Sequence, residues 1–516
     1  MKSTESRKTE KRKYGACAGI LIYLYLSLPT LIFLTGWLKW YFALPFAALT
    51  AFACVRAFSD SVQERCFVLG GCNAGTFLKA ALLISLWVYL SGIGGWCYQN
   101  SDHEVRNAIF RALVEYDWPV VSHGGDRGLV YYIGFWLPAA CVGKVCGLEA
   151  GYAAQFMWAV AGIFIVYYLI CIYRGKADLL PLLFLVFFSG LDYAGTWILG
   201  EEGTDLRLAA HLEWWAADFQ FTSMTAQLFW VFNQAVPAWV ATAAVLVQKN
   251  GKNMLFLLAV TMLSATIPFV GLIPIVLYLY AGRIRADRKN AKELLTFQNM
   301  VGVFVVGICM FLYLSGNISG GMIEKDNAHL VLQEPAAGWL RYFLFYFLEF
   351  GVYLYFLYRY RKSDSLIWFV TVLLLVCPFI KVGEGHDFCM RASVPALFVL
   401  MLRCMETWEG AWTDVCAESG SRECADKVTG VRTAGKKYLF AAYCAVLLLG
   451  AVTPFNEIHR SVRETFWRVT YGQSVRYPEI RIEGQLLRYG NFSGDVQGSF
   501  FYRIWQMSMG LTSPAS

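Results

Sequence analysis

Apolar segments separated by short polar breaks recur along most of the chain and constrain its fold more than any other feature. A helix needs about 20 apolar residues to cross a bilayer, and backbone polar groups in lipid must be satisfied within the segment. With 57% hydrophobic residues in 516, the sequence predicts an all-α, multi-pass membrane protein. The fourteen candidate segments are 16–36, 38–57, 80–97, 129–147, 153–173, 180–198, 225–247, 254–266, 268–282, 298–315, 338–358, 365–382, 391–406 and 437–454.

Basic residues predict which of these segments cross the membrane. The N-terminal tail, residues 1–15, carries six Lys and Arg, so the positive-inside rule places it in the cytoplasm. If segment 129–147 does not cross, the later basic clusters also lie in the cytoplasm, and if it crosses, they all lie outside. The first arrangement is favoured. It leaves about thirteen crossings and an extracytoplasmic tail at 455–516.

Segment 129–147 has its own reasons not to cross. It is rich in aromatic residues, is interrupted by Pro138 and carries Lys144, which is costly at the centre of a bilayer. We expect a juxtamembrane or re-entrant helix inside a first large outer loop at about 98–151. An extra helical hairpin and a cytoplasmic loop (16–79) then precede the main transmembrane domain (80–454).

Composition excludes several other classes of protein. The net charge of +7 is spread over short loops, which is not the pattern of a nucleic-acid-binding surface. The fifteen Cys fall mostly inside apolar segments and form no CxxC motif, so they are expected to pack as small hydrophobic residues. No dinucleotide fingerprint, P-loop, HExxH or GxSxG motif is present. The first apolar run lacks a cleavage site and is expected to be a retained span.

Asp102, His103 and Glu104 form the strongest candidate site. They follow the apolar segment 80–97 directly, and the stretch 105–119 behind them has the apolar spacing of an amphipathic helix lying on a membrane surface. Ionisable groups beside a membrane span are suited to removing a proton from an acceptor hydroxyl. The alternative interpretation is a solvated polar loop.

Polar residues inside later spans are further candidates. Asp192 lies near the outer end of an apolar segment, where it is either a site residue or a hydrogen-bond partner for a helix end. Asn233 and Gln234 lie within another span, where amides usually hydrogen-bond between helices.

Cations at the predicted outer boundary could bind a lipid-linked phosphate. Arg391 opens a span and can grip phosphate with paired hydrogen bonds, or instead snorkel or pair with Asp387 four residues earlier. Lys381 and Arg106 are weaker candidates for the same role. His386 lies in the same boundary segment, and all six His fall on the predicted outer side, which indicates chemistry at that face.

With these motifs in place, the layout resembles the GT-C superfamily of membrane glycosyltransferases, and most closely the bacterial relatives of protein O-mannosyltransferases and the aminoarabinose lipid A transferases. Asp102-His-Glu104 is similar to the family's acidic pair, and Tyr116-Asp-Trp-Pro119 to a later element. Residues 131–147 resemble its second juxtamembrane helix, and Asp192 its second-loop acid. The resemblance covers about 80–400. Two departures are the His between the acids and the two extra spans before residue 80.

The resemblance implies transfer of a sugar from a polyprenyl-phosphate donor to a lipid, glycan or protein acceptor. The transfer would take place at the outer face of a bacterial plasma (inner) membrane, with inversion at the sugar carbon. An acid of the first loop would act as general base, and an interfacial cation such as Arg391 would stabilise the leaving phosphate. We expect no cofactor, although Asp102, Glu104 and Asp192 could supply oxygen ligands to a divalent metal.

Two other functions remain open from the sequence. A flippase or transporter of a lipid-linked saccharide would also need an outward polar cavity, but it should carry charged residues within several spans, of which Glu349 is one. A polymerase or ligase of surface polysaccharide would share the chemistry but not the acidic first loop.

Overall fold

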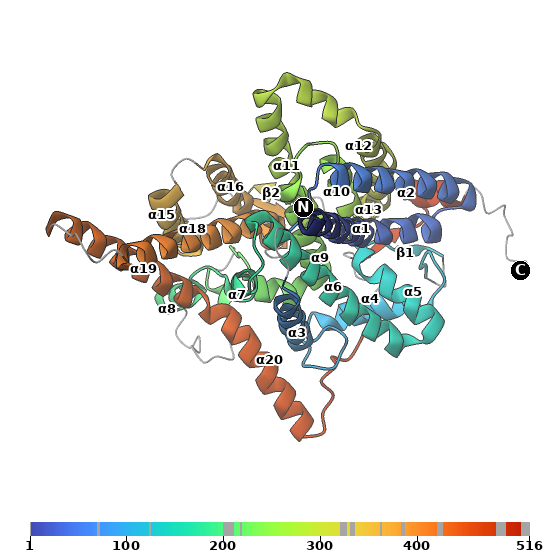
Figure 1. The fold of residues 1–516 in the computed structure, drawn as a ribbon. Coiled ribbons are helices and arrows are strands. Elements are labelled where there is room, and N and C mark those ends of the chain that lie inside the picture. Colours follow the sequence, from blue (N-terminus) through green and yellow to red (C-terminus); the bar gives the residue numbers. More distant parts are fainter. Residues whose placement is uncertain are drawn as a thin grey trace, which may run out of the picture. The chain divides into compact units, whose positions relative to one another are not determined.

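The computed structural model describes residues 2–69, 73–122, 125–199, 211–216, 219–319, 328–330, 336–361, 364–382, 387–420, 427–480 and 492–506 (Figure 1). Helices make up most of it, and nine helices of the described part are long and apolar enough to cross a membrane. Three shorter apolar helices accompany them: 74–90, 134–146 and 365–379. The predicted class, a helical multi-pass membrane protein, is confirmed.

The chain divides into two compact units. The first lies within residues 1–177, 230–327 and 465–516, and the second within 178–229 and 328–464. Two of the four boundaries fall inside helices, one in α9 (Met224–Val247) and one in α20 (Val452–Thr470).

The first unit is built on a pair of long N-terminal helices. α1 (Lys2–Trp37) and α2 (Trp40–Gln63) pack side by side, as the predicted extra hairpin requires (Figure 1). Two strands, β1 and β4, pair antiparallel, with Gly128 opposite Gly494. The other elements are α3 (Ala74–Leu90), α4 (His103–Glu115), β1 (Arg127–Leu129), α5 (Leu137–Cys146), α6 (Leu148–Arg174), α10 (Met254–Thr261), α11 (Thr266–Ala286), α12 (Phe297–Val301), α13 (Ile308–Ser319), β4 (Ser493–Asp495) and α21 (Phe500–Gln506).

The second unit contains the remaining helices and one small sheet. Its strands, β2 (Ala328–Leu330) and β3 (Ile380–Val382), pair antiparallel. A π-helical segment, Phe347–Gly351, joins two of its helices. These helices are α7 (Leu180–Phe187), α8 (Asp192–Leu199), α14 (Ala336–Tyr346), α15 (Val352–Arg361), α16 (Ser365–Val376), α17 (Asp387–Ala392), α18 (Val394–Gly420) and α19 (Lys427–Gly450).

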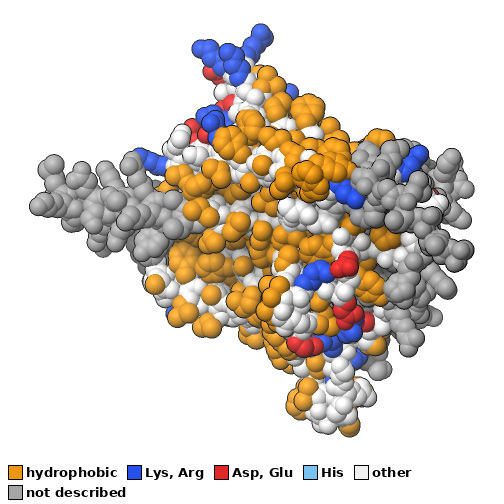
Figure 2. Space-filling view, turned by 90° about the vertical axis from the view of Figure 1, so that its right-hand side faces the viewer, with side chains coloured by type: hydrophobic (Ala, Val, Ile, Leu, Met, Phe, Trp, Pro, Cys, Tyr) orange, Lys and Arg blue, Asp and Glu red, His pale blue; other side chains and the backbone are white. Residues whose placement is uncertain are grey.

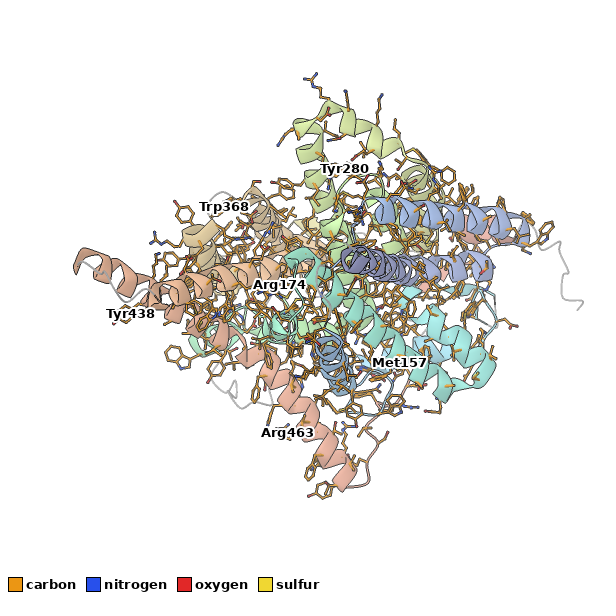
Figure 3. All side chains as sticks on the ribbon, in the orientation of Figure 1. Met157, Arg174, Tyr280, Trp368, Tyr438 and Arg463 are labelled. Atoms are coloured by element: carbon orange, nitrogen blue, oxygen red, sulfur yellow. The ribbon has the colours of Figure 1, made fainter. Side chains whose placement is uncertain are left out.

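Exposed apolar side chains identify surfaces suited to lipid. On α3, Leu78, Leu82 and Leu86 are 63%, 63% and 55% exposed and recur every four residues, so they share one helix face. Figure 2 shows hydrophobic side chains over much of the face that it draws. Figure 3 marks Met157, 60% exposed, on α6. Apolar surface of this extent fits a bilayer rather than water.

Segment 129–147 forms a short helix, as expected of a juxtamembrane element. A three-residue 3-10 turn, Gly134–Trp136, leads into α5, whose ten residues span about 15 Å, half of a hydrocarbon core. The expected role of Pro138 was wrong. It occupies the first turn of α5, where its missing N–H has no intrahelical partner to lose, and therefore begins the helix instead of breaking it.

Candidate functional site

Helix α4 carries the predicted acidic motif at its N-terminus. The backbone N–H groups of His103 and Glu104 donate to the carbonyls of Asn100 and Ser101, which closes the first turn. One face of the helix is buried and includes Ile109, so packing fixes its rotation. Glu104 lies in the first turn, where the helix dipole favours a negative charge.

Asp102 and Arg106 form an ion pair one turn apart on α4. Arg106 Nη2 donates to Asp102 Oδ2 at 2.7 Å, and the side chain of Asp102 is 42% exposed while that of Arg106 is 9% exposed. The guanidinium lies over the ring of Phe232, 5.6 Å from its centroid. Its other terminal nitrogen, Nη1, is buried and has no hydrogen-bond partner among the described residues.

His103 is buried against the same aromatic ring. It is 1% exposed, and its ring centroid lies 5.6 Å from that of Phe232. Nδ1 lies 3.1 Å from Asn100 Oδ1, so Nδ1 carries the proton and Nε2 is left as an acceptor, which has no partner within the described part of the chain. Burial, and then the charge of Arg106, lower the pKa of His103 well below its usual range, so the ring is neutral at pH 7.

The amides predicted in α9 adjoin this ring in sequence. Val231 has non-helical angles (φ −135°, ψ 33°) and interrupts the helix directly before Phe232. Asn233 and Gln234 are each 1% exposed, yet Asn233 Nδ2 and Gln234 Oε1 have no hydrogen-bond partner among the residues described. The interhelical bonds expected for these amides are therefore not made by these two atoms. Buried polar atoms are generally paired, so such exceptions are typical of a site that receives a ligand or water.

Glu104 differs from Asp102 in its surroundings. It is half-buried, and its carboxylate has no ion pair or hydrogen bond within the described ranges. Nor do the described residues contain a group of three His, Cys, Asp or Glu side chains placed to hold a metal ion. No disulfide bond joins the described cysteine side chains.

The second unit buries a separate polar cluster around Asp192, the first residue of α8. Asp192 is 1% exposed and accepts from Ser189 Oγ at 2.8 Å. The carboxyl group of Glu349, in the π-helical segment, interacts directly with it and accepts from Trp215 Nε1 at 3.2 Å. A Cβ at Gly190 would lie 1.9 Å from Glu349 Oε2, so only glycine fits there.

His211 connects two more acids of this cluster. Its Nδ1 lies 3.1 Å from Glu457 Oε1 and its Nε2 3.9 Å from Glu213 Oε2. Glu213 also accepts from the backbone N–H and the hydroxyl of Ser223, at 2.9 and 2.8 Å. Glu457 accepts from Arg460 as well.

These contacts shift the pKa values of Glu213 and His211. Burial raises the pKa of Glu213 to about 7, although the charge of His211 opposes the change. Burial lowers the pKa of His211, but the hydrogen bond to Glu457 and the charges of Glu213 and Glu457 outweigh it and raise the pKa overall.

The sequence did not identify most of this cluster. Glu349 could be found because it interrupts an apolar span, but Glu213 and Glu457 lie outside the apolar segments and carry no motif. Of the predicted phosphate-binding residues, Arg391 is half-buried on α17. The side chains of Lys381 and Asp387, and the whole of His386, lie outside the described residues.

An apolar groove of about 590 Å³ lies beside α7 in the second unit. Its walls include Phe184, Trp408 and Leu447, from α7, α18 and α19. Phe188 at one wall precedes Ser189 of the polar cluster, and Phe455 at another precedes Glu457 by two residues.

No family model and no curated protein match the chain. Two solved structures are similar to it, both of ArnT from Cupriavidus metallidurans. The first, bound to undecaprenyl phosphate, has a TM-score of 0.38 at 12% identity and covers 77% of each chain. The second, in the apo state, has a TM-score of 0.36 at 12% identity over 77% of this chain and 76% of the other.

Proposed function

We propose that this protein is an integral membrane glycosyltransferase that moves a sugar from a polyprenyl-phosphate donor to an acceptor at the outer face of the membrane. The observation that carries the proposal is the Asp102–Arg106 pair at the start of α4, with one guanidinium nitrogen buried and unpartnered beside neutral His103. This arrangement combines a carboxylate at the surface with a fixed cation behind it.

The cation is suited to the leaving phosphate. Asp102 holds one edge of the Arg106 guanidinium, which leaves Nη1 to donate to a phosphate oxygen. A donor already in place, in a water-poor site, stabilises charge as it develops on the phosphate. Arg391, in the second unit, is proposed separately as a lipid-phosphate-binding residue.

Glu104 is proposed as the general base because its carboxylate has no partner among the described residues, whereas Asp102 is held by Arg106. The acceptor oxygen forms a bond to the anomeric carbon as the bond from that carbon to the phosphate oxygen breaks. The polyprenyl phosphate leaves with the electron pair, and the hydroxyl proton passes to Glu104. Direct displacement inverts the sugar carbon.

The apolar groove beside α7, within the second unit, is proposed to hold an apolar lipid chain. Phe184, Leu447 and the other lining residues offer a wall without charge, as an isoprenoid requires. The acceptor, whether lipid, glycan or protein, is left to experiment.

The test is sugar transfer in membranes that contain the protein, supplied with a panel of polyprenyl-phosphate sugars. Wild type is compared with Glu104→Gln, Asp102→Asn and Arg391→Ala. Consumption of one donor, lost in Glu104→Gln while the variant still folds, supports the proposal and identifies the base. If no donor is consumed, the transferase proposal fails.

A flippase or transporter of a lipid-linked saccharide is the second candidate, and one observation favours it. Asp192, Glu349 and Glu457 are acids buried within helices long enough to span a membrane, a placement common in proton-coupled transport. Movement of labelled lipid-linked sugar between leaflets without sugar transfer would establish this function instead.

A further inference from the structure

We infer that residues 465–480, here called the C-terminal strap, position helix α4, and that Gln99 is the positioning residue through which they do so. The inference rests on the proposed function only where it concerns catalysis. Within the first unit the strap lies against the segment that precedes α4, where the backbone N–H of Gln99 donates to the carbonyl of Val475.

Gln99 joins three segments through one side chain. Its Oε1 accepts from the backbone N–H of Tyr477 at 2.9 Å and from Asn107 Nδ2 at 2.8 Å. Its Nε2 donates to the carbonyl of Gly92 at 2.9 Å, and its backbone N–H donates to the carbonyl of Val475 at 3.1 Å. Gln99 is 1% exposed. The loop, the strap and α4 therefore meet at one buried amide.

Asn107 carries this connection to the candidate site. It is 3% exposed and lies one helical turn after His103 on α4, next to Arg106 in sequence. A shift of Asn107 therefore moves the turn that carries both site residues. A displacement of about 1 Å can cost on the order of 100-fold in rate when it misplaces reacting groups.

Two ion pairs, one from Arg476 and one from Glu479, secure the strap. Arg476 makes a two-pronged contact with Glu149, at 2.8 and 2.9 Å, and its guanidinium lies 4.2 Å from the ring centroid of Tyr152. Glu479 lies 2.5 Å from Arg111 Nε on α4 and accepts from the hydroxyl of Tyr152 at 2.9 Å. The second ion pair ties the strap directly to the site helix.

The loop before α4, residues 91–102, contains no helix or strand that would hold α4 in position. Between Leu90 and His103 it forms only turns and bends, and Gly92, Gly94 and Gly95 adopt positive φ. A Cβ at Gly95 would lie 2.5 Å from Arg476 Nε, so the loop is shaped to admit the strap.

The test is amide hydrogen exchange of α4 in the full-length protein, without substrate. Gln99→Leu leaves the N–H of Tyr477 and the amide of Asn107 without an acceptor, and we expect exchange in α4 to rise about tenfold or more. Gln99→Glu keeps both accepting contacts but loses the bond to the carbonyl of Gly92, so exchange in α4 should rise less than in Gln99→Leu. Ser474→Ala is the matched control, because its exposed hydroxyl bonds only within the strap.

A second variant keeps the test decisive if Gln99→Leu fails to fold. Glu479→Gln removes the charge opposite Arg111 and keeps the contact with Tyr152, so exchange should rise in α4 and not in α11. Unchanged exchange in α4 for both Gln99→Leu and Glu479→Gln overturns the inference.

Kinetics separate this inference from the proposed function. If sugar transfer is found, Gln99→Leu should lower kcat while the donor KM stays within about twofold, and Gln99→Glu should lower kcat less than Gln99→Leu does. A fall in donor affinity with kcat unchanged argues against positioning. If no transfer is found at all, the exchange result still decides the role of the strap.

Discussion

Asp102 and Arg106 pair at 2.7 Å on one face of α4, and the pair is asymmetric: the carboxylate is 42% exposed and the guanidinium side chain only 9%. A pair whose carboxylate is exposed adds little stability, because water screens that carboxylate. Its value lies in geometry, because Asp102 fixes the buried guanidinium against Phe232 with Nη1 available.

Arg106→Gln should lower sugar transfer by about 100- to 1,000-fold, the usual cost of removing one donor to a developing negative charge. The rate constant kcat in purified protein, with a fixed donor, is the measurement. Arg463→Gln is the control, since Arg463 is 48% exposed on α20 and forms an ion pair with its neighbour Glu464 (Figure 3). Equal loss in both variants would argue for a general effect of charge.

Glu104→Gln should lower kcat more than Asp102→Asn does. Loss of a general base lowers kcat by about 100- to 10,000-fold, whereas loss of a residue that orients Arg106 should cost about tenfold. The values of kcat for the two variants, measured side by side with the same donor, distinguish them. The reverse order of effects would assign the base to Asp102.

Glu213 should make the protein less stable as pH rises. Its folded pKa, about 7, lies above its unfolded value, so the native state binds the extra proton. The stabilisation is fully present below about pH 4.3, the unfolded value, and is lost as pH rises through about 7. His211, whose pKa is also raised, acts in the same direction. The Tm of wild type should fall between pH 5 and 8.

Glu213→Gln should flatten this dependence, because the amide cannot lose a proton. Glu115→Gln, on the exposed end of α4, is the control and should leave the slope unchanged. A slope that persists in Glu213→Gln would assign the dependence to other groups.

Gly190→Ala should destabilise the second unit by about 1–3 kcal/mol, the usual cost of overpacking. The reason is the 1.9 Å approach of a Cβ to Glu349 Oε2. Thermal unfolding is the measurement. The double variant Gly190→Ala/Glu349→Ala should lose less stability than the sum of the single changes, and additivity would show that the clash does not occur.

Ala451→Trp should weaken binding of a long-chain isoprenoid to the protein, because the indole would occupy the groove beside α7. The dissociation constant is the measurement, and a short-chain isoprenoid, which fills less of the groove, is the control. An equal change for both would place the chain elsewhere.

The sequence predicted the features that depend on local pattern. The spans follow from apolar length, and α4 follows from the spacing that buries Ile109 and Leu113 while leaving Glu104 half-buried. The predicted helix was too long, since α4 ends at Glu115 and the sequence runs on through a cis Trp118–Pro119 bond.

What could not be predicted depends on contacts between distant segments. Phe232 organises His103 and Arg106, but nothing in its own sequence distinguishes it from other aromatic residues in apolar spans. The meeting of His211 with Glu457 joins residues 246 positions apart. No periodicity in a single sequence encodes such a pairing.

The distance in sequence between Gln99 and Tyr477, 378 residues, has a consequence for how the protein is made. Synthesis is directional, so α4 enters the membrane surface long before its partner leaves the ribosome. Until the strap arrives, the backbone N–H of Gln99 lacks the carbonyl of Val475 and must be satisfied by water, and the loop that precedes α4 has no partner across it. A chain interrupted before residue 465 would carry every acid of that loop and still lack the segment that sets them in place.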